Sequence, residues 1–339
     1  MPSSPAPSSP ATDIVSLADI EAAARAIDGV AVKTPVLESP LLNAALGCRL
    51  RVKAEPLQIT GSFKFRGAYN AISRIPEARK AAGVVAFSSG NHAQGVAAAA
   101  SMLGLPAAIL MPADAPKTKV RLTKDWGAEV IPFDRFTQSR EEMGAKLCAD
   151  RGATLIKPYD DPLIMAGQGT LAREAVQACL EGGWTPDLFL SPAGGGGLIA
   201  GCSTAVKALS PTTQVYSVEP AGFDDTARSL VQGAKVANDP KARSICDALL
   251  APEPGDLTFR VNRETLTAGL AVTDEEALTA MAVAFRYLKL VIEPGGAVAL
   301  AAVISGKLDV KGKRVLVVAS GGNADAEVFT EALARPLPF

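Results

Sequence analysis

Histidine is almost absent from this sequence, since His92 is the only one in 339 residues. A metal site built from several histidines is therefore excluded, and a Ser-His-Asp triad would need His92 itself. Acid–base chemistry must come mainly from lysine, serine, carboxyl groups or a cofactor.

Cysteines paired at metal-ligand spacing are also lacking. Five cysteines are spread along the chain: Cys48, Cys148, Cys179, Cys202 and Cys246. An odd number without a secretory signal is typical of reduced thiols in a cytoplasmic protein, most of them buried as small apolar side chains. Residues 1–12 are rich in Ser, Pro and Ala and uncharged, so we expect a disordered tail there rather than a signal peptide.

Neither sign of charge is in excess, with 34 basic and 35 acidic residues. This balance gives no basic footprint for nucleic acid or for an anionic membrane, and no apolar run is long enough to span a bilayer. With 48% hydrophobic and 20% charged residues, the chain is expected to be globular and soluble, with one large or two interleaved domains.

From about residue 80, short apolar runs alternate with longer amphipathic stretches. The apolar runs predict strands at Val84–Ser88, Ala107–Met111, Glu129–Phe133, Thr154–Lys157, Leu188–Ser191, Gln214–Val218 and Val315–Ala319. The stretches between them predict helices such as Asn91–Leu103, Ser139–Arg151, Gly169–Leu180 and Glu275–Leu288. Apolar strands separated by helices indicate a doubly wound α/β fold with mostly parallel sheets covered on both faces.

The spacing of these elements favours two sheets. We expect residues 84–161 to form a small, mobile domain. Residues 13–83 and 162–335 would then form a larger domain. No repeat of 20 to 50 residues is evident.

A run of four glycines, Gly194, Gly195, Gly196 and Gly197, follows the predicted strand at 188–191. In doubly wound sheets, ligands bind where strands end and helices begin. Successive glycine N–H groups can point at one anion, and the following helix adds its dipole, so the run predicts a phosphate site. A flexible turn is the alternative.

Two further loops have the same position. Ser88-Ser89-Gly90-Asn91-His92 follows a predicted strand and suits a carboxylate, because backbone amides and the Ser and Asn side chains can donate to it. The other explanation is a helix cap by Ser89 or Asn91. Ser320-Gly321-Gly322-Asn323 repeats the geometry after the strand at 315–319, where a simple turn is equally consistent with the sequence.

Lys64 lies between Phe63 and Phe65 at the start of a predicted helix. These apolar neighbours could desolvate the amine and lower its pKa toward nucleophilic reactivity. Most lysines at such positions are simply solvated. A second open question is the acidic loop from Glu219 to Asp225, whose carboxylates suit a hard divalent cation, although acidic loops are often plain surface.

Together, these motifs resemble the serine/threonine dehydratase and serine racemase family, which are fold-type II pyridoxal phosphate enzymes. The resemblance is carried, in order, by Ser62-Phe63-Lys64-Phe65-Arg66-Gly67-Ala68, the 88–92 loop, the glycine run and the 320–323 loop, and it covers about residues 15 to 330. It implies an enzyme, commonly a homodimer, whose partner is a small amino acid substrate.

The resemblance also implies a role for each matching residue. Lys64 would bind the cofactor aldehyde as a Schiff base and act as the base at the substrate Cα. Phe63 would pack on the ring, Asn91 would bond its phenolic oxygen, Gly194 to Gly197 would hold the phosphate, and Ser320 would meet the pyridine nitrogen. Ser88, Ser89, Asn91, His92 and Arg140 would line the substrate side.

Ser320 and Ser89 refine the chemistry that the resemblance implies. A hydroxyl at the pyridine nitrogen makes the ring a weaker electron sink than a carboxylate would, which favours β-elimination over transamination. Ser89 matches the racemases and hydroxyaspartate dehydratases of the family, in which it faces the lysine across the cofactor and exchanges a proton there. Racemase side activity is therefore a hypothesis.

The same resemblance implies a function for the acidic loop and for Arg140. Glu219, the carbonyl of Phe223 and Asp225 match a racemase-like site for Mg²⁺, with Ca²⁺ or Mn²⁺ as alternatives. Arg140 aligns with a small-domain arginine that could receive the distal carboxylate of hydroxyaspartate, although a helix-surface arginine would look the same.

Two departures from the family bear on the activity. No regulatory domain follows the matching region, so feedback control by isoleucine is not expected. Ala251 stands where serine racemases have serine, which favours a dehydratase. We therefore predict β-elimination from L-threonine or L-serine to a 2-oxo acid and ammonia. The alternatives are 3-hydroxyaspartate dehydration, serine racemisation, or, in another class, a non-catalytic α/β protein that binds a phosphorylated metabolite.

Overall fold

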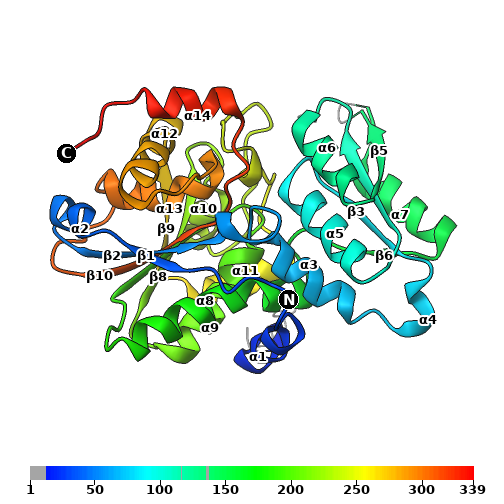
Figure 1. The fold of residues 1–339 in the computed structure, drawn as a ribbon, viewed down its shortest axis with the longest axis horizontal. Coiled ribbons are helices and arrows are strands. Elements are labelled where there is room, and N and C mark those ends of the chain that lie inside the picture. The colour runs from blue at the N-terminus through cyan, green and yellow to red at the C-terminus, as the bar shows by residue number, and fades with distance from the viewer. Residues whose placement is uncertain (1–12, 116, 135–136) are drawn as a thin grey trace, which may run out of the picture.

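A computed structural model of the protein describes residues 13–115, 117–134 and 137–339, so the tail predicted for residues 1–12 lies outside the described residues. Two mostly parallel sheets, one of six strands and one of four, are covered by helices and lie side by side (Figure 1). This architecture confirms the predicted α/β fold.

The larger sheet has the strand order β1-β2-β10-β7-β8-β9. Only β1 is antiparallel to its neighbour, and the other strands run parallel. Along β10, Val315 and Val317 join the core on the α13 side, whereas Leu316 and Val318 join the core formed with α8 and α9. Its strands are β1 (Val36–Glu38), β2 (Arg49–Ala54), β7 (Leu188–Pro192), β8 (Gln214–Pro220), β9 (Ala268–Val272) and β10 (Arg314–Ala319).

The smaller sheet has the order β5-β4-β3-β6, and all of its strands are parallel. They are β3 (Val84–Phe87), β4 (Ala107–Pro112), β5 (Glu129–Phe133) and β6 (Thr154–Leu155). All four therefore lie between residues 84 and 155. The predicted domain limits at residues 84 and 161 stay a prediction.

Helices cover both sheets (Figure 1). Those beside the larger sheet or at the junction are α1 (Leu17–Ala26), α2 (Pro40–Leu46), α3 (Lys64–Ser73), α8 (Pro162–Glu181), α9 (Gly197–Leu209), α10 (Asp225–Gln232), α11 (Asp256–Thr265), α12 (Asp274–Val283), α13 (Pro294–Ile304) and α14 (Ala326–Leu333). Those beside the smaller sheet are α4 (Glu77–Lys80), α5 (Asn91–Met102), α6 (Lys117–Asp125) and α7 (Arg140–Arg151). Short 3₁₀ turns η2 (Glu55–Leu57) and η3 (Asp247–Leu249) and a π-helical turn η4 (Ala284–Leu288) complete the set.

All seven predicted strands exist, with ends shifted by up to two residues, but β1, β2 and β9 were not predicted. In β2, Arg49, Arg51 and Lys53 alternate with apolar residues, so no continuous apolar run marks the strand. Strand β9 is rich in Ala and Gly and lacks the bulky β-branched residues that usually indicate a strand.

Helix α3, which begins at Lys64, is anchored by a buried ion network around Arg66. The Arg66 guanidinium donates to both oxygens of Glu55 at 2.8 and 2.9 Å and to Glu174 of α8 at 2.7 and 3.0 Å. Both Arg66 and Glu55 are fully buried, and Lys53 adds a second cation to Glu174 at 2.6 Å. The network therefore fixes the start of α3 relative to β2 and α8.

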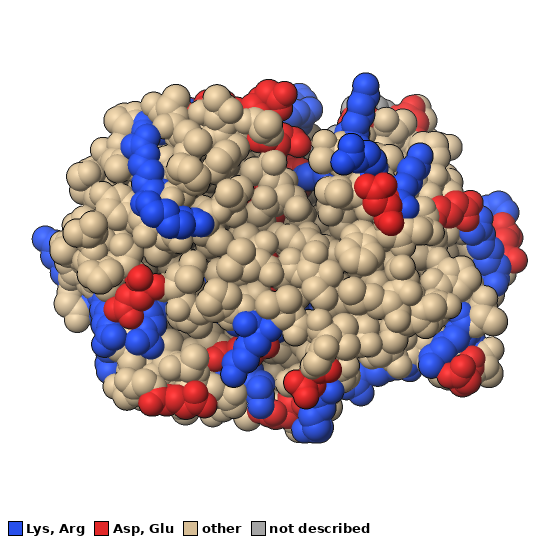
Figure 2. Space-filling model, in the orientation of Figure 1, with Lys and Arg blue, Asp and Glu red and all other residues tan. Residues whose placement is uncertain are grey.

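On the face in Figure 2, acidic and basic side chains gather mainly toward the rim, around a broad area with little charge. Within the described ranges, no helix has the length and apolar character needed to cross a membrane. Four of the five cysteines are buried, and all five are unpaired.

Candidate active site

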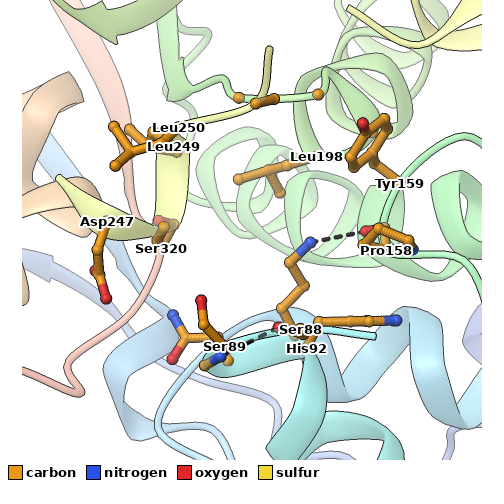
Figure 3. Close-up of a pocket in the computed structure, with 18 of the residues that line it drawn as sticks. Ser88, Ser89, His92, Pro158, Tyr159, Leu198, Asp247, Leu249, Leu250 and Ser320 are labelled. Atoms are coloured by element: carbon orange, nitrogen blue, oxygen red, sulfur yellow. Dashed lines mark hydrogen bonds between the residues drawn. The ribbon is translucent and has the colours of Figure 1, made fainter. Parts of the chain in front are cut away.

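One pocket is lined by all twelve residues predicted to bind cofactor or substrate: Phe63, Lys64, Ser88, Ser89, Asn91, His92, Arg140, Gly194, Gly195, Gly196, Gly197 and Ser320. They come from both sheets, at the ends of β3, β7 and β10 and the starts of α3, α5, α7 and α9. Figure 3 shows the Ser88 and His92 side, the Tyr159 side and the Ser320 side facing the same space. The individual roles of these residues remain predictions.

Lys64 is the first residue of α3, and its Nζ donates to the backbone oxygen of Pro158 at 2.7 Å (Figure 3). Burial lowers the pKa of the amine to about 8. The nitrogen also lies 5.2 Å from the centre of the Phe63 ring. A larger fraction of this amine is uncharged at neutral pH than for an ordinary lysine, which suits a nucleophile or a base.

The glycine run connects β7 to α9, and Gly196 has the left-handed backbone φ of 91°. A Cβ on Gly195 would overlap the Tyr159 ring, and one on Gly197 would lie 2.8 Å from the same residue. The loop is therefore tightly covered by Tyr159, and only glycine fits there. The N-terminus of α9 directly follows, so backbone N–H groups and the helix dipole favour an anion at this place.

The serine loop leads from β3 into α5. Ser88 Oγ accepts a hydrogen bond from the Gly90 N–H at 3.1 Å, which shapes the turn, and Ser89 lines the pocket beside it. The His92 ring nitrogen Nε2 lies 3.0 Å from the Ile156 carbonyl. Burial, with nearby Lys64 adding to it, lowers the pKa of His92 to about 3, so its ring is neutral at physiological pH. An acid–base role for His92 near pH 7 is thus disfavoured.

Arg140 begins α7 and lines the pocket from the smaller sheet. Its guanidinium lies 5.2 Å from the centre of the Phe87 ring and pairs with Glu141 at 2.8 Å. The side chain is still 41% exposed, so this pair is weak and exchangeable. Arg140 is therefore on a helix surface and on the pocket wall at once.

Several pocket residues were not predicted as site residues. Lys119 of α6, only 5% exposed, donates to Asp247 of η3 at 2.5 Å and so joins the two sides of the pocket. Tyr159 follows β6 and covers the glycine run. Asp247 also lines the pocket, but no sequence spacing connects it with Lys119, 128 residues away.

The predicted metal ligands lie outside this pocket, at the junction of β8 and α10. Glu219 is fully buried and accepts from the Thr226 and Ala227 N–H groups at 3.1 and 3.0 Å. Burial raises the pKa of Glu219, and the nearby Asp225 charge raises it further. Burial also raises the pKa of Asp225, to about 6. Asp225 Oδ1 accepts from Asn238 at 2.6 Å, whereas Oδ2 is buried with no partner among the described residues.

Two buried, mutually repelling carboxyl groups with a free oxygen fit a cation, and they would hold it together with the Phe223 carbonyl. No cluster of three or more His, Cys, Asp and Glu side chains arranged for a metal occurs in the part of the chain that the structure describes. A divalent cation there would therefore depend on backbone oxygen and water ligands, and the site remains a proposal.

The fold and the pocket define a class of enzyme. A lysine with a lowered pKa faces a glycine-rich anion loop at a helix N-terminus, between two α/β sheets. That combination suits an enzyme that holds a phosphorylated aldehyde cofactor by an amine and by its phosphate.

The chain belongs to the family of pyridoxal-phosphate dependent enzymes, whose model matches residues 27–321. It is 44% identical over 315 residues to the L-threo-3-hydroxyaspartate ammonia-lyase of Pseudomonas sp., which covers 93% of this chain and 97% of the relative. The Saccharomyces cerevisiae protein of the same name is 41% identical over 298 residues, or 88% and 90% of the two chains. Among solved structures, the serine racemase of Dictyostelium discoideum has a TM-score of 0.85 and 36% identity, covering 92% and 99%.

Proposed function

We propose that this pyridoxal-phosphate dependent ammonia-lyase acts on 3-hydroxyaspartate. The sequence placed L-threonine or L-serine first and 3-hydroxyaspartate second. Two relatives that are more than 40% identical and are named L-threo-3-hydroxyaspartate ammonia-lyases favour the second of these interpretations. The products would be a 2-oxo acid, oxaloacetate, and ammonia.

The observation that carries the proposal is the position of Arg140 on the pocket wall. A substrate with two carboxylates needs two anion subsites. The Ser88–Ser89 loop at the start of α5 suits the α-carboxylate, and Arg140 can bind the distal carboxylate with two parallel hydrogen bonds. Its present partner, Glu141, is 62% exposed, so exchanging it for a substrate costs little.

When bound, pyridoxal phosphate supplies the electron sink that makes the α-hydrogen of an amino acid acidic and lets a β-hydroxyl leave. The chain's own groups then divide the work. Lys64 would be the base that removes the α-hydrogen, because its lowered pKa of about 8 leaves more of its amine uncharged near pH 7 than in an ordinary lysine. The Gly194–Gly197 loop would hold the phosphate, and Ser320 would hold the ring nitrogen.

A 2-oxo acid assay tests the substrate. We expect kcat/KM for L-threo-3-hydroxyaspartate to exceed the values for L-threonine, L-serine and D-serine. Arg140→Ala should lower kcat/KM for hydroxyaspartate by roughly 10- to 100-fold, the value of a lost charged hydrogen bond, and should change the value for L-serine little.

Arg151 offers a matched control, because it ends the same helix and pairs with Glu129 on the surface. Arg151→Ala removes the same charge and should leave both substrates unaffected. An equal loss for serine and hydroxyaspartate in Arg140→Ala would count against a distal-carboxylate subsite. A higher kcat/KM for L-threonine than for hydroxyaspartate would instead support threonine dehydration as the activity.

Serine racemisation is a second candidate, supported by Ser89 on the pocket wall together with Lys64. A hydroxyl on the face opposite the lysine could return a proton to the other side of the substrate Cα. Ser89→Ala should then abolish racemisation of serine and spare elimination. Full-rate racemisation by that variant would remove Ser89 from this role.

A non-catalytic phosphometabolite-binding protein is the remaining alternative. Purified protein with visible absorption that borohydride or Lys64→Ala removes would support the lyase, whereas colourless protein that cannot be reconstituted with pyridoxal phosphate would support the alternative. The cytoplasmic location and the homodimer stay predictions.

A further inference from the structure

The side-chain amide of Asn91 is held from two sides by residues to which the sequence assigned no role. Asn323 Nδ2 donates to Asn91 Oδ1 at 2.8 Å, and Asn91 Nδ2 donates to Glu293 Oε1 at 2.5 Å. Asn91 lines the pocket, but neither Asn323 nor Glu293 is among the residues that line it. Their hydrogen bonds to Asn91 are therefore a direct route by which these two residues can act on the pocket.

The chemistry of the partners fixes which way each amide points. Asn323 Nδ2 also donates to the backbone oxygen of Thr60 at 2.9 Å, and a carbonyl oxygen can only accept. The NH₂ group of Asn323 must therefore face Thr60, and the same group faces Asn91. Asn91 in turn presents its oxygen to Asn323 and its NH₂ group to the Glu293 carboxylate.

Among the residues that the structure describes, this arrangement leaves one N–H of Asn91 without an acceptor. The amide nitrogen carries two hydrogens, and Glu293 takes one of them. The second is a donor for an acceptor in the pocket, where the family resemblance expects the phenolic oxygen of the cofactor. If the Asn91 amide were flipped, its oxygen would face Glu293 Oε1, and the two oxygen atoms would repel each other. The same oxygen would also repel the phenolic oxygen of the cofactor.

The carboxyl group of Glu293 is buried and closely surrounded. Glu293 is 2% exposed, stands at the N-cap position of α13, and donates its backbone N–H to the Gly321 oxygen at 3.0 Å. A Cβ on Gly321 would overlap Glu293 Oε1. The Glu293 carboxyl therefore fits at this place only because residue 321 has no side chain. Its second oxygen, Oε2, is buried without a partner among the described residues.

A buried carboxyl with an unsatisfied oxygen is costly, so its presence here calls for an explanation. Burial raises the pKa of Glu293 to about 7. The Lys119 charge opposes that change, and the Asp247 and Asp325 charges add to it. The hydrogen bond from Asn91 also lowers this pKa and thus favours the ionised, accepting form.

We propose that Glu293 and Asn323 are positioning residues that lock the Asn91 amide, so that it offers an N–H and not its oxygen to the phenolic oxygen of pyridoxal phosphate. The inference goes beyond the proposed function, because it concerns the cofactor and holds for any of the candidate substrates. A wrong assignment of the substrate can thus be distinguished from a wrong assignment of these positioning residues.

The experiment measures pyridoxal phosphate binding to the apo protein and the absorption band of the bound cofactor. Glu293→Ala should weaken binding about tenfold, as for loss of one charged hydrogen bond, and should shift the pH dependence of the band. Glu293→Gln keeps an oxygen that accepts from Asn91 and should stay within about threefold of the original affinity.

A double-mutant cycle separates positioning from general structural damage. In an Asn91→Ala background, adding Glu293→Ala should change neither the affinity nor the band any further. Additive losses in the double variant would overturn the proposal, as would an equal loss in Glu293→Gln. Where Glu293→Ala fails to fold, Asn323→Ala enters the same cycle with the same expectation, and an unchanged affinity and band there would overturn the proposal.

Discussion

The Nζ atom of Lys64 donates a hydrogen bond to the backbone oxygen of Pro158 at 2.7 Å, across 94 residues of sequence. Pro158 lies in the segment between β6 of the smaller sheet and α8, which packs beneath the larger one. The amine that begins the proposed chemistry is thus bonded to the connection between the two sheets. Its hydrogen bonding therefore depends on how the sheets are placed relative to each other.

The first prediction concerns the pH dependence of Lys64 in the apo protein. Because burial lowers its pKa to about 8, the rate at which apo protein captures pyridoxal phosphate should rise with pH, with a midpoint near 8 rather than near 10.5. Stopped-flow absorption measures this rate. Lys64→Ala should abolish the signal, and a midpoint above about 10 would contradict the burial effect.

The same shift predicts the sign of a stability change. The pKa of Lys64 is lower in the folded protein than its ordinary value of 10.5, so the unfolded chain binds more protons between about pH 8 and 10.5. Apo protein should therefore gain stability as the pH rises over that interval. Below pH 8, the full free-energy cost of burying the charged Lys64 amine is present. Lys64→Met should raise the free energy of unfolding at pH 7 by about 1–2 kcal/mol, since the pocket screens part of the charge. Urea denaturation at pH 7 and pH 10 tests this.

The second prediction concerns the buried network under α3. Arg66→Met removes the cation between Glu55 and Glu174 and leaves a fully buried carboxylate without its main partner. We expect a loss of about 3–5 kcal/mol in unfolding free energy, measured by denaturant titration. Lys146→Ala, which breaks an exposed pair with Asp150, is the control and should cost under about 0.5 kcal/mol. Equal effects for both variants would contradict the anchoring role of Arg66.

The third prediction concerns the proposed cation at Glu219 and Asp225. A cation would relieve the repulsion between the two buried carboxyl groups, so chelation by EDTA should lower the melting temperature, and Mg²⁺ or Ca²⁺ should restore it. In Asp225→Asn the repulsion is gone, so EDTA should have little effect on that variant. A melting temperature that EDTA leaves unchanged in the original protein would remove the cation from the proposal.

The sequence predicted the site better than the contacts that support it. Lys64, the glycine run and the serine loop each lie where an apolar run meets a helix start, which is a local signal. Lys119 carries no such signal, and nothing local to Glu293 indicates its partner, because the contacts with Asp247 and Asn91 join residues 128 and 202 positions apart. Such pairings arise from the packing of the two sheets, and no period or spacing in one sequence encodes them.

The fold shows the same division between local and distant causes. Strands β3 and β10 are continuous apolar runs and were found, whereas β2 alternates charged and apolar residues. The buried amine of Lys53 in β2 donates to Glu174, 121 residues later, and to the backbone oxygen of Thr34 at 2.7 Å. The sequence alone makes that lysine look like surface.

The last prediction concerns the close approach of α8 and α9, which determines where the glycine run lies. A Cβ on Gly201 would overlap the Met165 backbone oxygen and lie 2.7 Å from the Gly169 nitrogen. Neither atom can move without its helix, so Gly201→Ala must push α9 away from α8. We expect a loss of roughly 1–3 kcal/mol in stability, as for an overpacked core.

The displacement should reach the pocket as well, because Gly197 begins the same helix four residues earlier. Gly201→Ala should therefore weaken pyridoxal phosphate binding in addition to lowering stability, and titration of the apo protein measures both effects. Gly182→Ala is the control at the end of α8, where an added Cβ would find its nearest atom at 3.4 Å. A destabilised Gly201→Ala protein with undiminished cofactor affinity would show that the glycine run keeps its place independently of the packing of α8 on α9.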